Sequence, residues 1–367
     1  MTKGRYFPQK IYIERENVGS PLTKRILRNA SQVPVEIIER ANDVIEAMKL
    51  SKDVIGEGKK YLLITKQKGE FVKPCPCTPQ YIGCNYSIIN LDINCPLECS
   101  YCILQLYLNN PLITVYANIQ DLWKQLDAFL FSNRDRSIRI GTGELGDSLA
   151  FDHITENSRA LISYFRDKDN VLFEMKTKTI NIDNILKEKP VENVIIAWSL
   201  NSKKIAQEEE MGAPSVEERI SAARRITERG FRVAFHFDPI IRYSGWESDY
   251  ADVVRELVNN ITPSRIAWIS LGSLRFPPSL KLIIQRRFPQ SKIIYEEFVR
   301  GRDGKLRYFK PLRFEQYKRI IRLIEAWGGG KIPLYFCMET EEFWRKMLKK
   351  KPRSKEDIEK YLSLPLG

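Results

Sequence analysis

The chain has 367 residues, of which 43% are hydrophobic and 29% are charged, so it can bury a sizeable core and is not globally disordered. No apolar run approaches the roughly 18 residues that a membrane span requires, and the N-terminal residues do not read as a secretory signal. Lys and Arg outnumber Asp and Glu by 59 to 46, and the net charge of +13 favours a polyanionic partner, nucleic acid first and a membrane surface second. Composition therefore excludes membrane-spanning, secreted and fibrous classes and predicts a soluble cytoplasmic protein.

Residues 1–86 are predicted to form an α-rich N-terminal region. Apolar residues at helical spacing predict a helix over Val35–Leu50, and the apolar run Tyr61–Thr65 predicts a short strand. The Pro- and Cys-rich stretch Lys73–Asn85 predicts an irregular loop that leads into the next region.

From residue 87 onward, short apolar runs alternate with amphipathic stretches. Runs of this length and apolarity are typical of parallel strands covered by helices. Six such units predict an α/β fold with a partial parallel (β/α)6 barrel over residues 87–275, and a doubly wound open sheet fits the same periodicity. The runs are Ser87–Ile93, Ser137–Gly141, Val171–Met175, Val194–Leu200, Val233–Phe237 and Ile266–Leu271.

The segments between these runs are predicted to be helices. Ser215–Gly230 is the clearest, with Ser215 as the N-cap, Glu218 three residues later and a glycine at the end. Asp121–Leu130 and Tyr250–Ile261 repeat the pattern. These helices would cover the outer face of the predicted barrel.

Residues 276–367 are basic and aromatic and are predicted to form a C-terminal extension. Two candidate strands within Tyr295–Arg313 flank a polar turn at residues 302–305, which predicts a basic β-hairpin. The stretch Lys346–Lys355 is expected to be the solvated end of a helix and a tail.

Seven cysteines are present, and six of them fall within residues 75–102. Clustered thiols in a reducing compartment more often hold a metal or do chemistry than form disulfides. Cys95, Cys99 and Cys102 have C-x3-C-x2-C spacing. Three such thiolates can hold three corners of a [4Fe–4S] cluster and leave one iron open to chelate a small molecule. A zinc site, which normally takes four ligands, and inert buried cysteines are the alternatives.

The motif and several other stretches resemble a known enzyme family. A cysteine triad with an aromatic residue, Tyr101, before its last cysteine resembles the radical S-adenosylmethionine (SAM) superfamily. Over roughly residues 70–340 the chain also resembles the spore photoproduct lyase family within it. The matching stretches are Asn94–Gln105, Gly143–Asp152, Ser199–Asn201, Phe235–Trp246 and Leu306–Lys310.

The resemblance implies a radical SAM carbon–carbon lyase that repairs DNA. Its substrate would be spore photoproduct, a methylene-bridged thymine dimer, and its products two thymines. The implied cofactors are a [4Fe–4S] cluster on the three motif cysteines and SAM on the open iron. A 5′-deoxyadenosyl radical derived from SAM would abstract hydrogen from the lesion, and Tyr101 would lie near the adenine.

The resemblance also implies a set of SAM-binding residues at the ends of the predicted strands. Glu144 and Asp147 would contact the methionine part, although Asp147 could instead cap a helix. Lys178 is expected to pair with the SAM carboxylate, and Ser199 and Asn201 to bind the carboxylate or the ribose. For each of these, an ordinary loop residue after a buried strand is the alternative.

The predicted hairpin combines positive charge with an aromatic side chain. Arg302, Lys305, Arg307 and Tyr308 would pair with phosphates and open the duplex around a damaged base pair. The resemblance implies that Arg307 and Tyr308 are the pair at the lesion. An exposed basic hairpin without this role is the alternative.

The chain departs from the family pattern at the group that returns a hydrogen atom to the thymine radical. That group is a cysteine near the aspartate after the second strand, yet Ile138–Asp152 contains no cysteine and position 103 is Ile instead of Tyr. A thiol S–H bond is weak and therefore a suitable hydrogen source. We hypothesise that Cys75, or with less support Cys77 or Cys84, is the relocated donor; a structural role or a small zinc site is the alternative.

The expected partners are UV-damaged DNA and a flavodoxin- or ferredoxin-like electron donor, and the chain is expected to act as a monomer away from membranes. The missing cysteine leaves two other functions open. One is a radical SAM enzyme that acts on another DNA lesion or a modified nucleotide. The other is an iron–sulfur nucleic-acid-binding sensor, which would need no chelating site.

Overall fold

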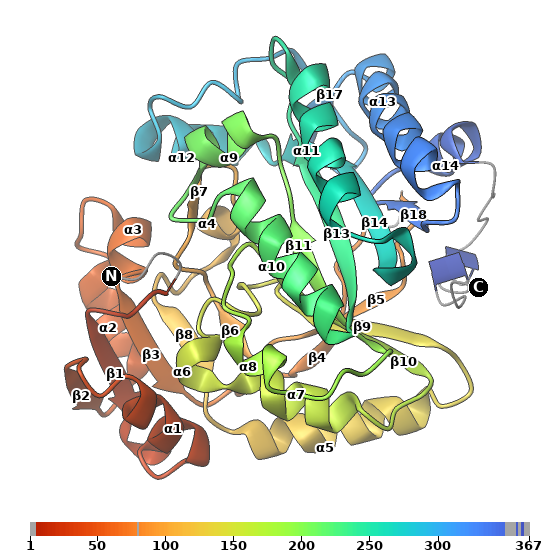
Figure 1. Ribbon diagram of the computed structural model, residues 1–367. Coiled ribbons are helices and arrows are strands. Elements are labelled where there is room, and N and C mark those ends of the chain that lie inside the picture. Colours follow the sequence, from red (N-terminus) through yellow and green to blue (C-terminus); the bar gives the residue numbers. More distant parts are fainter. Residues whose placement is uncertain (1–4, 79–80, 349–356, 359–360, 363–367) are drawn as a thin grey trace.

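A curled sheet of eight strands organises the molecule (Figure 1). The structure is a computed structural model that describes residues 5–78, 81–348, 357–358 and 361–362. Within these residues no helix is long and apolar enough to cross a membrane. The strands, in sheet order, are β18 (Leu334–Phe336), β14 (Ile266–Ser273), β13 (Arg232–Ile240), β11 (Val194–Ser199), β10 (Val171–Thr177), β9 (Ile138–Thr142), β5 (Tyr86–Ile89) and β4 (Val72–Pro74).

Strand order distinguishes between the two predicted architectures. From β5 to β18 every pair is parallel, and strands that follow one another along the chain within this sheet are neighbours in it. A doubly wound sheet would instead reverse its strand order near the middle. The fold is therefore mixed α/β with a sheet curled into a half-barrel. Each of the six predicted runs contains a strand, and β18 adds a parallel strand that is too short for its pattern to predict.

Helices lie outside the curled sheet, as the amphipathic stretches predict (Figure 1). The predicted capping box of α10 is present: Ser215 Oγ accepts from the backbone of Glu218, whose carboxylate accepts from the backbone of Ser215. The helices are α1 (Pro21–Asn29), α2 (Ala41–Met48), α3 (Val54–Gly58), α4 (Leu104–Tyr107), α5 (Ile119–Ser132), α6 (Asp152–Thr155), α7 (Asn157–Phe165), α8 (Asp183–Leu186), α9 (Lys203–Glu209), α10 (Val216–Arg229), α11 (Trp246–Asn260), α12 (Pro278–Arg287), α13 (Lys310–Gly328) and α14 (Glu341–Met347).

The N-terminal region is built on a sheet of its own and is not mainly helical. The helix predicted over Val35–Leu50 is wrong in its first part, because residues 35–38 form a strand parallel to β1 and only α2 is helical. Strand pairing outweighs a weak helical spacing here, and β-branched residues favour it. In sheet order the strands are β2 (Val35–Ile38), β1 (Lys10–Glu14), β3 (Tyr61–Thr65), β8 (Ile113–Tyr116) and β6 (Asp92–Ile93).

The two sheets cross the predicted boundary at residue 86. β4 precedes that residue yet pairs with β5 in the half-barrel, whereas β6 and β8 follow it yet complete the N-terminal sheet. The edges of the half-barrel approach each other at an isolated bridge, in which the backbone N–H of Ile82 donates to Glu339 O at 3.1 Å. We call this junction the seam.

The predicted hairpin forms beside the barrel. β16 (Phe298–Arg300) and β17 (Leu306–Tyr308) pair antiparallel, and β15 (Arg275–Phe276) extends the sheet on the other side of β17. Gly304 takes a positive φ of 76° in the turn, a conformation that glycine adopts without strain. Most of Lys346–Lys355 lies outside the described residues.

The loop that carries the three motif cysteines is fixed to the barrel by a short antiparallel pair. β7 (Glu98–Cys99) pairs with β12 (Glu210–Met211), and the hydroxyl of Tyr101 donates to the Glu210 carboxylate. Glu210 also forms an ion pair of 2.6 Å with Arg219 of α10, and both side chains are at most 1% exposed. A buried carboxylate of this kind depends on its cation.

We expect Arg219→Met to lower the free energy of unfolding by about 3–5 kcal/mol, because the variant leaves the buried Glu210 carboxylate without its cation. Arg224→Met on the same helix is the matched control. Arg224 pairs with Glu228 at 3.2 Å with side chains 52% and 60% exposed, so its loss costs about 0–1 kcal/mol. Urea unfolding of the two variants measures the difference, and equal losses would contradict the prediction.

Candidate active site

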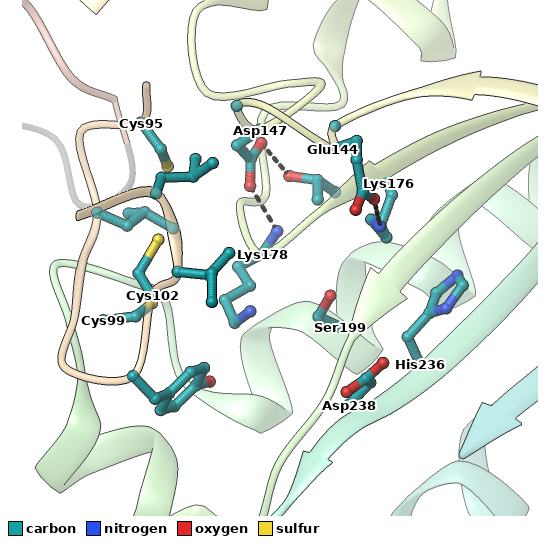
Figure 2. A pocket seen from close by; sticks show the side chains of 17 residues that line it. Cys95, Cys99, Cys102, Glu144, Asp147, Lys176, Lys178, Ser199, His236 and Asp238 are labelled. Carbon is teal, nitrogen blue, oxygen red and sulfur yellow. Dashed lines mark hydrogen bonds and ion pairs between the residues drawn. The ribbon is translucent and has the colours of Figure 1, made fainter. Parts of the chain in front are cut away.

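The three motif cysteines face one cavity of about 220 Å³ at the carboxyl ends of the barrel strands (Figure 2). Burial raises the pKa of the Cys99 thiol to about 12, so it becomes a ligand only when a cation displaces its proton. Within the described residues, no three His, Cys, Asp or Glu side chains surround one ion-sized site. Three cysteine thiols that line one cavity are the type of donor set that an iron–sulfur cluster takes.

Glu144, which follows β9, is paired with a lysine that the sequence analysis did not single out. Lys176 Nζ lies 3.0 Å from a Glu144 carboxylate oxygen, and both residues line the cavity. Burial alone would lower the pKa of Lys176, but the carboxylates of Glu144 and Glu174 outweigh burial and raise it. The Glu144 side chain is 33% exposed, so its carboxylate can still accept a hydrogen bond from a bound ammonium group.

The carboxylate of Asp147 is bound mainly by the chain itself. One oxygen accepts from the backbone N–H groups of Leu149 and Ala150, each at 3.0 Å. It also accepts from Thr177 Oγ1 at 2.7 Å, and the other oxygen accepts from the backbone N–H of Lys178 at 2.8 Å. Asp147 still lines the cavity, but its hydrogen bonds join the turn at residues 148–151 to the end of β10. It caps no helix, because the N-cap of α6 is Phe151.

Tyr101 and Lys178 lie together on the cavity wall. The ammonium of Lys178 is 5.7 Å from the centre of the Tyr101 ring. Burial alone would lower the pKa of Lys178, but the Glu210 carboxylate and the Cys99 thiol outweigh burial and raise it. The two residues thus offer a flat ring, held by Glu210, and a cation beside it.

Of the two polar residues at the end of β11, only Ser199 lines the cavity. Asn201 is 1% exposed and its amide is taken up by the chain: Nδ2 donates to Pro239 O at 3.1 Å, and Oδ1 accepts from the backbone N–H of Ser202 and from the Tyr250 hydroxyl. The prediction that Asn201 binds SAM directly is therefore not supported by its position.

His236 reaches the cavity edge from within the barrel. One ring nitrogen lies 2.6 Å from Ser270 Oγ and the other 2.8 Å from Glu174 Oε1. Trp268 Nε1 donates to the same Glu174 oxygen at 3.1 Å. Both ring nitrogens of His236 are occupied, so its role in the structure is to support the cavity wall.

A second and larger cavity, of about 710 Å³, adjoins the first. Tyr101, Cys102, Glu144 and Asp238 line both of them. Ile88, Leu274 and Phe336 give the larger cavity an apolar wall. Its remaining lining includes the four cysteines outside the motif, Cys75, Cys77, Cys84 and Cys337.

Asp238, on the wall shared by the two cavities, is bound by an arginine that sequence patterns do not mark. Arg275 donates to both Asp238 oxygens, at 2.9 and 3.1 Å. Burial alone would raise the pKa of Asp238, but Arg275 outweighs it and lowers that pKa. Arg275 Nη2, which donates to one of these oxygens, also lies 3.0 Å from Cys337 Sγ.

The hairpin residues divide into exposed and buried ones, which corrects part of the prediction. Tyr308 is 0% exposed and its hydroxyl accepts from the backbone N–H of Arg242 at 3.0 Å, so it is a core residue and not an exposed wedge. Arg307 is 3% exposed and is paired with Asp303. Lys305 lines the larger cavity and Arg302 is exposed on the turn, so these two remain available to a phosphate.

The site residues that the sequence analysis missed share one property. Lys176 lies one residue beyond a predicted strand, and Arg275 and Cys337 lie outside any recognisable motif. Arg275 and Cys337 are identified only by what they face in three dimensions. The alternation of strand residues could have found Lys176, because Glu174, Lys176 and Lys178 lie two apart on β10 and just beyond it.

Comparisons with known proteins identify the family of the chain. A family model described as spore photoproduct lyase matches residues 6–327. The spore photoproduct lyase of Geobacillus sp. is 25% identical over 317 residues, which are 82% of this chain and 89% of that protein. A solved mutant of spore photoproduct lyase with dinucleoside spore photoproduct superposes with a TM-score of 0.81 at 23% identity, covering 91% of this chain and 100% of that one.

A second solved mutant, with bound S-adenosylmethionine and dinucleoside spore photoproduct, gives a TM-score of 0.80 at 23% identity and covers 90% of this chain and 99% of that one. At this identity the solved structures establish the fold. The family model spans far more than half of the chain. The chain therefore belongs to the spore photoproduct lyase family.

Proposed function

We propose that this protein is a radical SAM lyase that repairs DNA by returning spore photoproduct to two thymines. The observation that carries the proposal is the junction of the two cavities. The three motif cysteines line the smaller one, and the larger one is apolar and lined by thiols. A cofactor site, a substrate site and a hydrogen source are thus next to one another.

The residues of the smaller cavity fit the implied cofactors. When bound, a [4Fe–4S] cluster and SAM would supply a 5′-deoxyadenosyl radical at the junction of the cavities. Cys95, Cys99 and Cys102 would hold the cluster. Around it, the ring of Tyr101 offers a surface for the adenine, and Lys178 a cation for the SAM carboxylate.

Three further residues complete the proposed SAM site. Glu144 would accept a hydrogen bond from the SAM ammonium group, because its carboxylate remains partly exposed beside Lys176. Ser199 presents a hydroxyl at the end of β11. Asp147 would position this site by holding the backbone of Lys178.

The larger cavity suits a lesion of two joined bases. Its volume of about 710 Å³ lies within the range of about 300–1,000 Å³ that is common for small-ligand sites. Thymine rings are apolar on their faces, so Ile88, Leu274 and Phe336 are matched to them. Lys305 at the rim and Arg302 beyond it would hold the flanking phosphates.

Cys75 is the proposed hydrogen donor. Burial raises the pKa of its thiol to about 12, so the S–H bond is intact at neutral pH. Transfer of that hydrogen atom to a thymine radical would give thymine and a sulfur-centred radical on Cys75. Cys77 and Cys84 line the same cavity and are the other candidates.

The activity test is an anaerobic reaction of the reconstituted protein with SAM, a reductant and DNA that carries spore photoproduct. We expect restored thymines together with 5′-deoxyadenosine, measured by mass spectrometry, and no thymine gain with undamaged DNA. Formation of 5′-deoxyadenosine over an untouched lesion would assign another substrate. Absence of 5′-deoxyadenosine would favour the iron–sulfur sensor.

Cys75→Ala should leave the formation of 5′-deoxyadenosine intact but divert most of the lesion from thymine to adducts of the unquenched radical. The reason is that the variant retains both cavities and loses only the S–H bond. The same substitution at Cys77 tests the next candidate. An unchanged product profile for Cys75→Ala would contradict the assignment.

Arg302→Ala should weaken binding to duplex DNA and reduce the slope of log affinity against log salt by about 0.9, as expected when one phosphate contact is lost. Arg28→Ala is the matched control, since Arg28 lies on α1 in the N-terminal region and is 69% exposed. Fluorescence anisotropy at several salt concentrations measures both slopes. An equal slope for the two variants would show that Arg302 does not contact a phosphate of the DNA.

A further inference from the structure

Cys337 brings a thiol to the larger cavity from the opposite edge of the half-barrel. Cys75, Cys77 and Cys84 lie between β4 and β5, whereas Cys337 directly follows β18. The two edges meet at the seam, where the backbone of Ile82 donates to the backbone of Glu339. The seam therefore brings thiols that are distant in sequence to one cavity.

The Cys337 side chain is held by charged groups and not by a metal-ligand set. Its sulfur lies 3.0 Å from Arg275 Nη2, and its S–H donates to Asp238. Its backbone N–H donates to Leu271 O at 3.0 Å, which continues the pairing of β18 with β14. Because both the backbone and the sulfur of Cys337 are held by neighbours, its side chain points in a defined direction.

Cys84 lies in the same loop as Cys75, between β4 and β5, and lines the larger cavity together with Cys337. Burial raises the pKa of Cys337 well above its usual value, and the nearby Cys84 and Cys75 contribute to that rise. Cys84 likewise contributes to the raised pKa of Cys75. All three line the larger cavity. The raised pKa keeps the hydrogen atoms on Cys75 and Cys337, so these two thiols are better suited to hydrogen-atom transfer than to nucleophilic attack.

Under the proposed function, Cys75 loses a hydrogen atom in each repair and must regain one. The residue after the last motif cysteine, Ile103, lines both cavities but offers only alkyl C–H bonds, which are stronger than an S–H bond and do not give a hydrogen atom to a sulfur radical. Transfer between two thiols breaks one S–H bond and forms another, so it is close to thermoneutral. A second thiol on the wall of the same cavity is the natural source.

We propose that Cys84 and Cys337 form a hydrogen-atom relay that restores the S–H bond of Cys75. This inference rests on the proposed function. The Cys75 sulfur radical takes a hydrogen atom from Cys84, and the Cys84 radical takes one from Cys337. The Cys337 radical then gains one electron from the low-potential electron carrier of the flavodoxin or ferredoxin class, and one proton from solvent beside Asp238.

The first test asks whether the sulfurs reach one another and needs no substrate. The metal-free full-length protein is oxidised mildly with diamide, digested and mapped by mass spectrometry. We expect peptides that link Cys84 to Cys337 and Cys75 to Cys84 in the folded protein, and a statistical mixture in the urea-denatured control. Absence of any native link from Cys337 to the loop cysteines would overturn the relay.

The second test separates the first turnover from later ones with lesion-bearing DNA. Cys337→Ser should restore thymine in the first turnover and then stop, whereas Cys75→Ser should misdirect the product already in the first turnover. Cys84→Ser is the second variant and should behave like Cys337→Ser.

Sustained wild-type turnover by Cys337→Ser would overturn the relay. Misdirected product from its first turnover would also overturn it, because Cys337 would then be a direct donor. If the wild type restores no thymine at all, the proposed substrate is wrong, and the disulfide map alone decides whether the three thiols are connected.

Discussion

The buried carboxylate of Glu210 is the constraint on which the site depends. Removing a charge from water costs several kcal/mol. An ion pair together with hydrogen bonds can offset a cost of about that size. Arg219 of α10 and the hydroxyl of Tyr101 provide these contacts. Because Glu210 also lies in β12, which pairs with the cysteine loop, one carboxylate ties that loop, the ring of Tyr101 and a barrel helix into a single unit.

In the half-barrel, the alignment of the strands determines which side chains meet at the site. Parallel strands end at one rim, so residues far apart in sequence converge there without any local motif. Asp238 lies where the two cavities meet, and its fixed pairing with Arg275 keeps charge on that boundary. The result is a smaller cavity that carries charged residues such as Glu144 and Lys178 beside a larger cavity with an apolar wall. Under the proposed function the first would hold the cofactors and the second the bases.

Patterns within a few residues of sequence predicted the features that depend on interactions within a few residues. The apolar runs located the barrel strands and the Ser215 capping box located α10, because each depends on neighbours within a few residues. Tyr308 was assigned to the surface because its neighbours are basic, yet its ring packs in the core. Cys337 could not be found at all, because its partners come from β13, β15 and the loop before β5. Sequence predicts elements well and three-dimensional neighbours poorly.

The seam has a consequence for how a substrate enters. A closed barrel admits only what passes through its mouth, which suits free small molecules. Here the two edges are joined by an isolated bridge between Ile82 and Glu339 instead of a continuous ladder. Under the proposed function, the side that carries the seam is therefore where a long polymer would lie, with one damaged unit turned inward and the rest of the strand outside.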